Sequence, residues 1–367
     1  MNIAYIVNAR IPTEKAHGFQ IMKVCEALAA LGHAVELVVP ARANAITLDA
    51  FSYYGLSSDF PIRKLRVVDR GFRIQSSSFL ASLLLLKLSR NTIIMTRDPE
   101  IAFLFIHRGH RVFYYAHNWP QSKIGLFKFM LKGVTGVICN SKGTEAEFKA
   151  EGFSNTIAVP NAVDLKEFDA LGDKAMLRAR LSIPTDKKIA MYVGHLYEWK
   201  GIDVVIAAAE VLNDDQRIMF WIIGGTDADI VKYRGIVIEK GLTNISILGH
   251  KNHSEISSFL SAADMLLLPN IPSSTESEHY TSPIKMFEYM ASGTPIIASD
   301  MPSMREVLND DNSTLIPARD AHALADAIAR ISANPEQLIE KATRAKVEAR
   351  TYSWDSLAHK IVSFIAV

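Results

Sequence analysis

The sequence has few cysteines and no long hydrophobic run. Its two cysteines, Cys25 and Cys139, exclude a disulfide scaffold and show no metal or redox spacing, so both are expected to be buried in a reducing compartment. The longest apolar run, Phe79–Leu86, is far shorter than the roughly 20 residues of a membrane-spanning helix. Residues Met1–Val7 indicate a strand and no signal peptide. We therefore expect a cytoplasmic protein, soluble or peripheral to a membrane.

Two common nucleotide-binding motifs are also missing. Neither G-x-G-x-x-G after a first strand nor G-x-x-x-x-G-K-[ST] occurs, which disfavours simple dehydrogenases and ATPases. His, Cys and Asp residues show no ligand spacing, so neither a metal nor another cofactor is expected.

The charge is almost balanced over the whole chain but not along it. A formal net charge of +1 gives no electrostatic reason to bind nucleic acid. Residues 1–165 hold 19 Lys and Arg against 12 Asp and Glu, whereas the remainder holds 21 against 27. A basic first domain and an acidic second one follow, and the basic surface is typical either of solvated faces or of contact with an anionic membrane.

Strand-like apolar runs alternate with helix-like patterns, which is typical of βαβ units and parallel sheets. We predict strands at Ile3–Val7, Ala34–Val39, Thr92–Thr96, Arg111–Tyr115, Gly136–Cys139 and Thr156–Val159, and then at Ile189–Val193, Ile218–Ile223, Ile245–Leu248, Met265–Leu268 and Pro295–Ala298. The fold class is therefore α/β, with two Rossmann-like, doubly wound sheets.

A polar stretch, residues 164–188, is predicted to be the linker and the entry to the second domain. The predicted domains are 1–165 and 166–350, followed by a terminal segment, 351–367. Apolar residues share one face of a helix in that segment, so this helix must pack against another element. Two such domains imply a cleft between them, with ligands at the carboxyl ends of the strands.

One helix start in the second domain indicates an anion site. Ser282 is a good N-cap, Pro283 suits the first helical position, and Lys285 adds a positive charge to the free amides of the first turn. Glu288 follows on an otherwise apolar helix, where its carboxylate needs hydrogen-bond donors. Sugar hydroxyls could supply them, but Glu288 could equally cap a neighbouring loop, and Lys285 could be an ordinary surface lysine.

A second basic feature follows the first strand of that domain. Gly194 permits a turn, and Lys200 precedes Gly201 and the next helix. The lysine ammonium could reach a diphosphate at the strand ends, although a single lysine before a helix is usually solvent-exposed.

In order along the chain, these motifs resemble family 4 glycosyltransferases of the GT-B fold. The second domain supplies G-x-L-x-x-x-K-G from Gly194, then Ile222–Gly225, Ala263–Asn270 and S-P-x-K-x-x-E-Y-M-A-S-G-x-P from Ser282; the first supplies the Gly18 loop, Thr96–Asp98, Tyr114–Asn118, Ile138–Ser141 and Val159–Asp164. The ending, Tyr352–Trp354, resembles the family's last helix, which crosses back onto the first domain. The resemblance implies that residues 1–165 form the acceptor side and residues 166–350 the domain that binds the nucleotide-sugar donor.

The resemblance implies a role for each matching residue. Lys200 and His117 would be catalytic, with Lys200 at the donor's diphosphate and His117 beside the reacting sugar carbon; as an isolated residue, His117 could also be a satisfied core histidine. Glu288 would hold ribose hydroxyls. The implied donor-binding set is Gly18, Gly194, His195, Lys200, Ser282, Pro283, Ile284, Lys285 and Glu288.

The chain departs from the family pattern at two positions. His195 stands where the family often has arginine, so that part of the phosphate charge depends on protonation. Tyr280 stands where a glutamate often faces the transferred sugar, which leaves the identity of the sugar open.

The implied activity is metal-independent transfer of a sugar, with retention of configuration, from a nucleotide diphosphate sugar to a glycan or lipid-linked acceptor in polysaccharide or glycoconjugate assembly. A nucleotide-sugar epimerase and a non-enzymatic two-domain binding protein are the alternatives. The apolar Ser76–Leu88 and the lysine-containing Ile124–Lys132 could rest on a membrane or be core helices.

Overall fold

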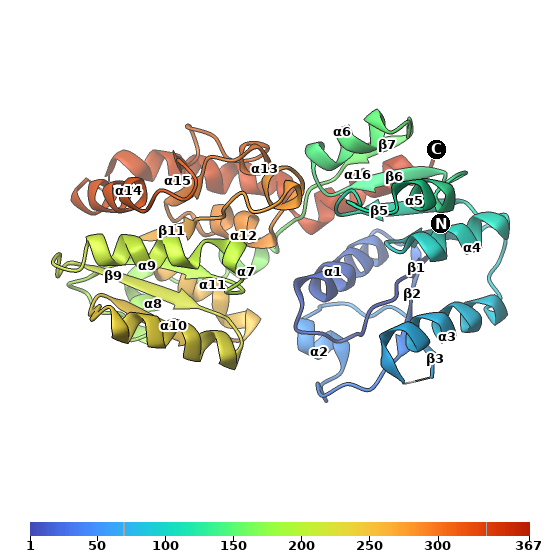
Figure 1. The fold of residues 1–367 in the computed structure, drawn as a ribbon, viewed down its shortest axis with the longest axis horizontal. Helices are drawn as coiled ribbons and strands as arrows, with labels where there is room; N and C mark the ends of the chain where they lie inside the picture. Colours follow the sequence, from blue (N-terminus) through green and yellow to red (C-terminus); the bar gives the residue numbers. More distant parts are fainter. Residues whose placement is uncertain (69, 335) are drawn as a thin grey trace. The chain divides into compact units, whose positions relative to one another are not determined.

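The computed structural model describes residues 1–68, 70–334 and 336–367 (Figure 1). They form two units, one of Met1–Asn161 with Trp354–Val367 and the other of Ala162–Ser353. Each unit is a parallel sheet with connecting helices, so the predicted α/β class with two doubly wound sheets is confirmed.

The first unit contains a seven-stranded parallel sheet in the order β3-β2-β1-β4-β5-β6-β7. The strands are β1 (Asn2–Ile6), β2 (Ala34–Ala41), β3 (Ile62–Arg66), β4 (Ile93–Thr96), β5 (Val112–Ala116), β6 (Gly136–Cys139) and β7 (Thr156–Ala158). The helices are α1 (Ala16–Ala30), α2 (Ala50–Tyr54), α3 (Gly71–Leu85), α4 (Pro99–His107), α5 (Ile124–Met130), α6 (Lys142–Ala150) and α16 (Trp354–Ile365). Strands β1, β4, β5 and β6 are almost wholly buried, as their apolar runs predict.

Helix α16 completes this unit although it comes from the end of the chain. It packs beside α1, where the Trp354 ring meets Phe19 edge-on at 6.0 Å between centroids. Phe364 lies so close to Gly136 that a Cβ there would be 2.8 Å from its ring. The predicted return of the last helix to the first domain is therefore confirmed.

The second unit contains a six-stranded parallel sheet in the order β10-β9-β8-β11-β12-β13. The strands are β8 (Lys188–Val193), β9 (Ile218–Ile223), β10 (Ile245–Gly249), β11 (Met265–Leu268), β12 (Ile296–Ser299) and β13 (Thr314–Ile316). The helices are α7 (Lys166–Asp169), α8 (Lys174–Arg180), α9 (Ile202–Val211), α10 (Asp227–Glu239), α11 (His253–Ala262), α12 (Ile284–Ser292), α13 (Pro302–Arg305), α14 (Ala321–Ala333) and α15 (Glu336–Ala349), with short helical turns η1 (Glu198–Lys200), η2 (Glu276–Tyr280) and η3 (Arg350–Tyr352).

Both sheets reverse their strand order next to their first strand. The reversal lies between β1 and β4 in the first unit and between β8 and β11 in the second. The loops after these strands diverge and leave room for a ligand, so a binding site is expected at the carboxyl end of each pair.

Residues 164–188, predicted to be the linker and the entry to the second domain, lie within the second unit, so the segment is the entry to that unit and not a separate linker. Helices α7 and α8 occupy much of this segment, and both contact α11 within the second unit. The charges of this segment suggested a solvated connection, but two of them are bound inside the unit.

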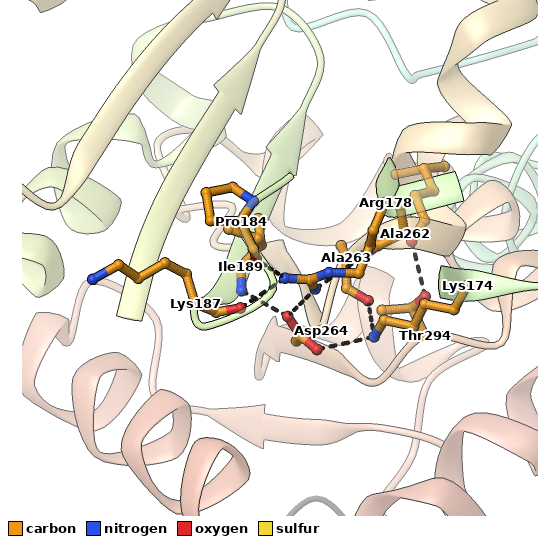
Figure 2. A network of polar contacts seen from close by, with 10 residues as sticks. Lys174, Arg178, Pro184, Lys187, Ile189, Ala262, Ala263, Asp264 and Thr294 are labelled. Carbon is orange, nitrogen blue, oxygen red and sulfur yellow. Dashed lines mark hydrogen bonds and ion pairs between the residues drawn. The ribbon is translucent and has the colours of Figure 1, made fainter. Parts of the chain in front are cut away.

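Asp264, which precedes β11, is the centre of that charge network (Figure 2). Its carboxylate accepts hydrogen bonds from Arg178 at 2.8 Å, from Lys174 at 3.0 Å and from the backbone amide of Ile189 at 2.8 Å. Arg178 also donates to the carbonyl groups of Pro184 and Lys187. Burial raises the pKa of Asp264, but these donors outweigh it and the pKa lies below its ordinary value. The network fixes α8 and the start of β8 to the start of β11.

We expect Arg178→Met to lower the free energy of unfolding by about 3–5 kcal/mol, because the change leaves Asp264 and two carbonyl groups with fewer donors. Urea unfolding followed by circular dichroism measures this loss. The control is Arg217→Met, which breaks an ion pair with Asp215 whose arginine is 73% exposed and should cost less than about 1 kcal/mol. Equal effects of the two substitutions would contradict a structural role for the Asp264 network.

Candidate functional site

The carboxyl ends of β8 and β11 are joined by unusually close backbone contacts. Gly201, with φ of 78°, ends η1, and a Cβ at this position would lie 1.8 Å from the carbonyl oxygen of Pro269. The amide of Ile271 donates to the carbonyl oxygen of Trp199 at 3.0 Å. The loop that carries Lys200 is therefore held against the end of β11, beside the reversal of strand order.

Lys285 lies in the same place, although it comes from α12. Its Nζ is 3.8 Å from the ring centroid of Tyr192, and a Cβ on Gly194 would be 3.5 Å from it. The Nζ is buried, and no residue in the described part of the chain offers it a hydrogen bond. Burial, and then the charge of Lys200, hold the pKa of Lys285 well below its ordinary value. A buried amine without a partner is costly, and an anion at this position would offset the cost.

Lys200 and His195 complete a basic group with Lys285. The Nζ of Lys200 lies 3.6 Å from the ring centroid of Trp199, and burial lowers the pKa of Lys200 to about 7. His195 stacks on Tyr197, and burial, followed by the charges of the two lysines, lowers the pKa of His195. The structure thus brings three of the predicted donor-binding residues together at the turn after Gly194.

The start of α12 differs by one residue from the prediction. The N-cap is Pro283, with extended ψ of 130° and no side-chain cap hydrogen bond, so neither Ser282 as N-cap nor Pro283 as first helical residue is correct. The helix begins at Ile284. Its first amides, those of Ile284 and Lys285, have no acceptor within the helix by geometry. They and the helix dipole add to the positive field.

Glu288 lies one turn further along α12, and its side chain is only 13% exposed. Its Oε1 is 4.0 Å from Nε2 of His253, which is also 3.9 Å from a carboxylate oxygen of Glu167. Burial, and then the charge of Glu167, raise the pKa of Glu288 to about 7. At 4.0 Å the contact with His253 is too long for a hydrogen bond, so it does not meet the predicted need of Glu288 for donors. The sequence pattern carries no signal for His253 or Glu167, which belong to α11 and to the segment predicted as linker.

Tyr280, the second departure from the family pattern, is buried on η2. Glu276 and Glu278 lie on the same turn, which is the one that leads into α12.

His117 and Gly18 belong to the first unit. His117 follows β5 and stacks on Tyr115 with 5.1 Å between ring centroids. Its Nε2 is buried without a hydrogen-bond partner in the described part of the chain, so His117 is not a satisfied core histidine. Burial, and then the charge of Arg97, lower the pKa of His117 well below its ordinary value, which keeps the imidazole neutral.

Gly18 lies in the first turn of α1, where neighbouring side chains of the same unit leave no space for a Cβ. A Cβ there would be 2.2 Å from Oη of Tyr54 and 2.5 Å from the methyl carbon of Thr13. The Tyr54 hydroxyl accepts from the amide of Thr13 at 2.7 Å and donates to its carbonyl oxygen at 2.8 Å. Gly18 therefore makes room for the contact that holds the loop between β1 and α1.

Two sequence models of known families match the chain on either side of the division between the units. The family described as "Glycosyltransferase Family 4" matches residues 18–167, and "Glycosyl transferases group 1" matches residues 173–354. The chain belongs to the family 4 glycosyltransferases of the GT-B fold.

Relatives of this family 4 member are distant. The putative teichuronic acid biosynthesis glycosyltransferase TuaC of Bacillus subtilis is 26% identical over 65% of the chain, and the D-inositol 3-phosphate glycosyltransferase of Corynebacterium glutamicum is 30% identical over 57%. The matched parts span 57% and 50% of those two proteins, so the chain spans little more than half of their length.

Solved structures share its fold over the whole chain. Sucrose-phosphate synthase from Thermosynechococcus elongatus has a TM-score of 0.80 at 20% identity, over 100% of this chain and 98% of that one. HepE of Anabaena, solved in complex with UDP, has a TM-score of 0.77 at 13% identity over 100% of both chains. These likenesses confirm the predicted fold.

Metal ligands do not gather in this family 4 member. Within residues 1–68, 70–334 and 336–367, no three His, Cys, Asp or Glu side chains come together as ligands would. Independence from metal stays a prediction.

We expect Gly18→Ala to destabilise the protein by about 1–3 kcal/mol, because the new methyl group overlaps the hydroxyl of Tyr54. Thermal unfolding measures the loss. Gly18→Ala should cost less in a Tyr54→Phe background than in the wild type, since the overlapping oxygen is absent there.

The control for Gly18→Ala is Gly125→Ala in α5, where an added Cβ meets no atom within 4 Å. It should leave stability unchanged or raise it slightly. If Gly18→Ala behaved like this control, close packing against Tyr54 would not be the reason for the glycine.

Proposed function

We propose that this chain transfers a sugar from a nucleoside diphosphate sugar to an acceptor hydroxyl. The observation that carries the proposal is the buried, unpartnered amine of Lys285 beside Lys200, at the strand-order reversal of a family 4 member. Two neighbouring lysines are suited to a diphosphate.

Charge development at the diphosphate explains how these groups would accelerate the reaction. As the bond to the sugar breaks, the departing nucleoside diphosphate gains negative charge. Lys200, Lys285 and the first amides of α12 would stabilise that charge more in the transition state than in the ground state. The leaving group would then need no metal ion.

The remaining predicted residues act on the sugar and the ribose. Glu288 would accept hydrogen bonds from ribose hydroxyls, and the neutral imidazole of His117 would hydrogen-bond to the sugar. We propose retention of configuration, with departure and attack on the same face of the sugar, as the family resemblance implies. Gly18 would bring the loop after β1 close to the substrates.

The names of related proteins suggest a donor and an acceptor class. HepE was solved with UDP and with UDP-glucose, so UDP is the first nucleotide to test here. TuaC is named for teichuronic acid biosynthesis, and another relative is a phosphatidyl-myo-inositol mannosyltransferase. A glycan or lipid-linked acceptor in polysaccharide or glycoconjugate assembly is therefore our proposal for this chain.

Labelled UDP-glucose distinguishes the three functions considered. A transferase releases UDP and labels an acceptor, an epimerase interconverts the sugars, and a binding protein leaves the nucleotide sugar unchanged.

We expect Lys285→Gln to weaken UDP binding about tenfold to a hundredfold, because one charge-assisted hydrogen bond to the diphosphate is lost. Isothermal titration calorimetry measures the affinity. The control is Lys232→Gln, which removes an exposed lysine that also lies over a tyrosine ring, at 4.9 Å. If both variants bound UDP like the wild type, Lys285 would not belong to the donor site.

The same titrations should show proton uptake above pH 7. Burial lowers the pKa of Lys200 to about 7, so much of this side chain is neutral in the free protein above that pH. A bound diphosphate stabilises the charged form, and UDP affinity should therefore fall as the pH rises from 7 to 9, by up to about tenfold per unit for each proton taken up. Lys200→Gln should reduce this slope, and an affinity independent of pH would contradict the assignment.

We also propose that the first unit rests on an anionic membrane through α3 and α5. Leu84 and Leu85 at the end of α3 are 61% and 82% exposed, and Leu126 and Phe129 on α5 are 53% and 58% exposed. Lysines accompany α5 at positions 123, 128 and 132, although Lys128 also pairs with Glu151 at 2.9 Å. Apolar side chains beside lysines suit the boundary between lipid headgroups and acyl chains. In the described part of the chain no helix has the length and apolar character needed to cross a bilayer.

Vesicles with anionic lipid should carry the protein upward in a flotation gradient at low salt, and neutral vesicles should carry much less. Leu85→Ser combined with Phe129→Ser should abolish flotation, since both apolar contacts are lost. Val231→Ser on α10, which removes an apolar residue that is 73% exposed in the second unit, should have no effect. Absence of the wild-type protein from the lipid fraction would end the membrane proposal.

A further inference from the structure

Buried polar atoms gather around Arg97 in the first unit. They are Oη of Tyr5, Nε2 of Gln20, Oη of Tyr115 and Nε2 of His117, and within the described part of the chain none makes a hydrogen bond of good geometry. Gln20 and Tyr115 are close enough that the Gln20 side chain lowers the pKa that burial raises at Tyr115. Tyr5, Gln20 and Tyr115 are at most 2% exposed. Arg97 donates to Oε1 of Gln20 at 3.3 Å, and the ring of Tyr115 lies 6.4 Å from that of Tyr5 and 5.1 Å from that of His117.

The residues of this cluster come from the strand-order reversal of the first sheet. Tyr5 lies on β1, Tyr115 on β5, and Arg97 and His117 directly follow β4 and β5. Gln20 and His17 come from the first two turns of α1. This is the end of the sheet where a doubly wound unit binds its ligand, and the start of α1 adds its positive dipole.

Burial raises the pKa of the neighbouring Asp98 and the charge of Arg97 acts against this rise, but Arg97 forms no close ion pair within the described residues. Its guanidinium donates to Oε1 of Gln20 at 3.3 Å, and no carboxylate of the described residues lies within ion-pair distance of it. Asp98 accepts a hydrogen bond from the amide of Asn8 at 2.9 Å.

The two histidines face the same unpaired charge. Burial, followed by the charge of Arg97, lowers the pKa of His17 to about 4 and that of His117 well below its ordinary value. The charge of Glu14 raises the pKa of His17, but Glu14 also forms an ion pair with Arg10 at 2.6 Å. Arg97 is therefore the positive charge that acts on both histidines and on Asp98.

The chemistry of the unpartnered atoms identifies the ligand that would satisfy them. Tyrosine hydroxyls, a glutamine amino group, an imidazole N–H and a guanidinium can all donate hydrogen bonds. The ligand faces several hydrogen-bond donors and one positive charge, so it should carry negative charge and offer only hydrogen-bond acceptors. An oxyanion has these properties. Arginine matches the planar edge of a carboxylate or phosphate with two parallel hydrogen bonds.

We propose that Arg97, with the hydroxyl group of Tyr115, binds an oxyanion, a phosphate or a carboxylate, that belongs to the acceptor substrate. This assignment to the acceptor rests on the proposed function, because the diphosphate of the donor is given there to Lys200 and Lys285 of the second unit.

The test follows the imidazole signals of His17 and His117 by NMR in the full-length protein, at constant ionic strength set with chloride. The probes are inorganic phosphate, glucuronate and glucose. We expect a saturable shift of both histidines with phosphate, with glucuronate or with both, and none with neutral glucose. A response to phosphate alone assigns a phosphate-bearing acceptor, and a response to glucuronate alone assigns a carboxylate-bearing one.

Variants separate the proposed site from general effects of salt. Arg97→Gln should weaken the response at least tenfold, whereas Arg90→Gln, at an exposed arginine of the same unit, should leave it unchanged. Tyr115→Phe keeps the ring in its stack with His117 and removes only the hydroxyl, so it should fold normally and weaken the response. Three results would overturn the proposal. They are an undiminished response in Arg97→Gln, a response to glucose equal to that of the anions, and no response to either anion.

Saturating UDP distinguishes this site from the donor site. The phosphate response should persist with UDP bound, and its loss would show that Arg97 serves the donor diphosphate, which would overturn the proposal. Failure of UDP to bind at all would instead contradict the proposed function, while the response of the histidines to phosphate would still report on Arg97.

Discussion

The buried amine of Lys285 is the constraint on which the second unit's site depends. The reversal of strand order places Gly194 beside the end of β11, where its φ of 142° requires glycine and its backbone lies next to the lysine amine. Tyr192 on β8 places the face of its ring against the lysine amine. Tyr289, which lies on α12 with Lys285, accepts a hydrogen bond from the backbone amide of Val193 at 2.8 Å. These contacts hold a positive charge away from water, where a phosphate interacts with it more strongly than at the surface.

The two units apply one principle with different residues. Each has a reversal next to its first strand, a helix that begins there, and a basic side chain that forms no close ion pair among the described residues. In the second unit the charges are lysines, which suit the spread charge of a diphosphate. In the first it is an arginine among neutral donors, which suits a single planar or tetrahedral anion.

Sequence patterns were sufficient for the sheets and for part of the site. Buried strands such as β8 and β11 were predicted because short, continuous apolar runs are typical of strands covered on both faces. The edge strand β3 was missed because three of its five residues, Arg63, Lys64 and Arg66, are basic and exposed, and the short strand β13 was missed as well. Lys200 and Lys285 were predicted as neighbours through their motifs. The pairing of Arg178 with Asp264, 86 residues apart, and the donors around Arg97 depend on tertiary contacts that no local pattern contains.

The return of α16 has a consequence for synthesis on the ribosome. The first unit includes residues from both sides of the second one, so its final helix, with Trp354 and Phe364, emerges only after the whole second sheet has been made. Units generally fold as they leave the ribosome. Here the lobe that is translated first is the last to become complete, and until then the surfaces of α1 and Gly136 that this helix covers are exposed to chaperones and to other nascent chains.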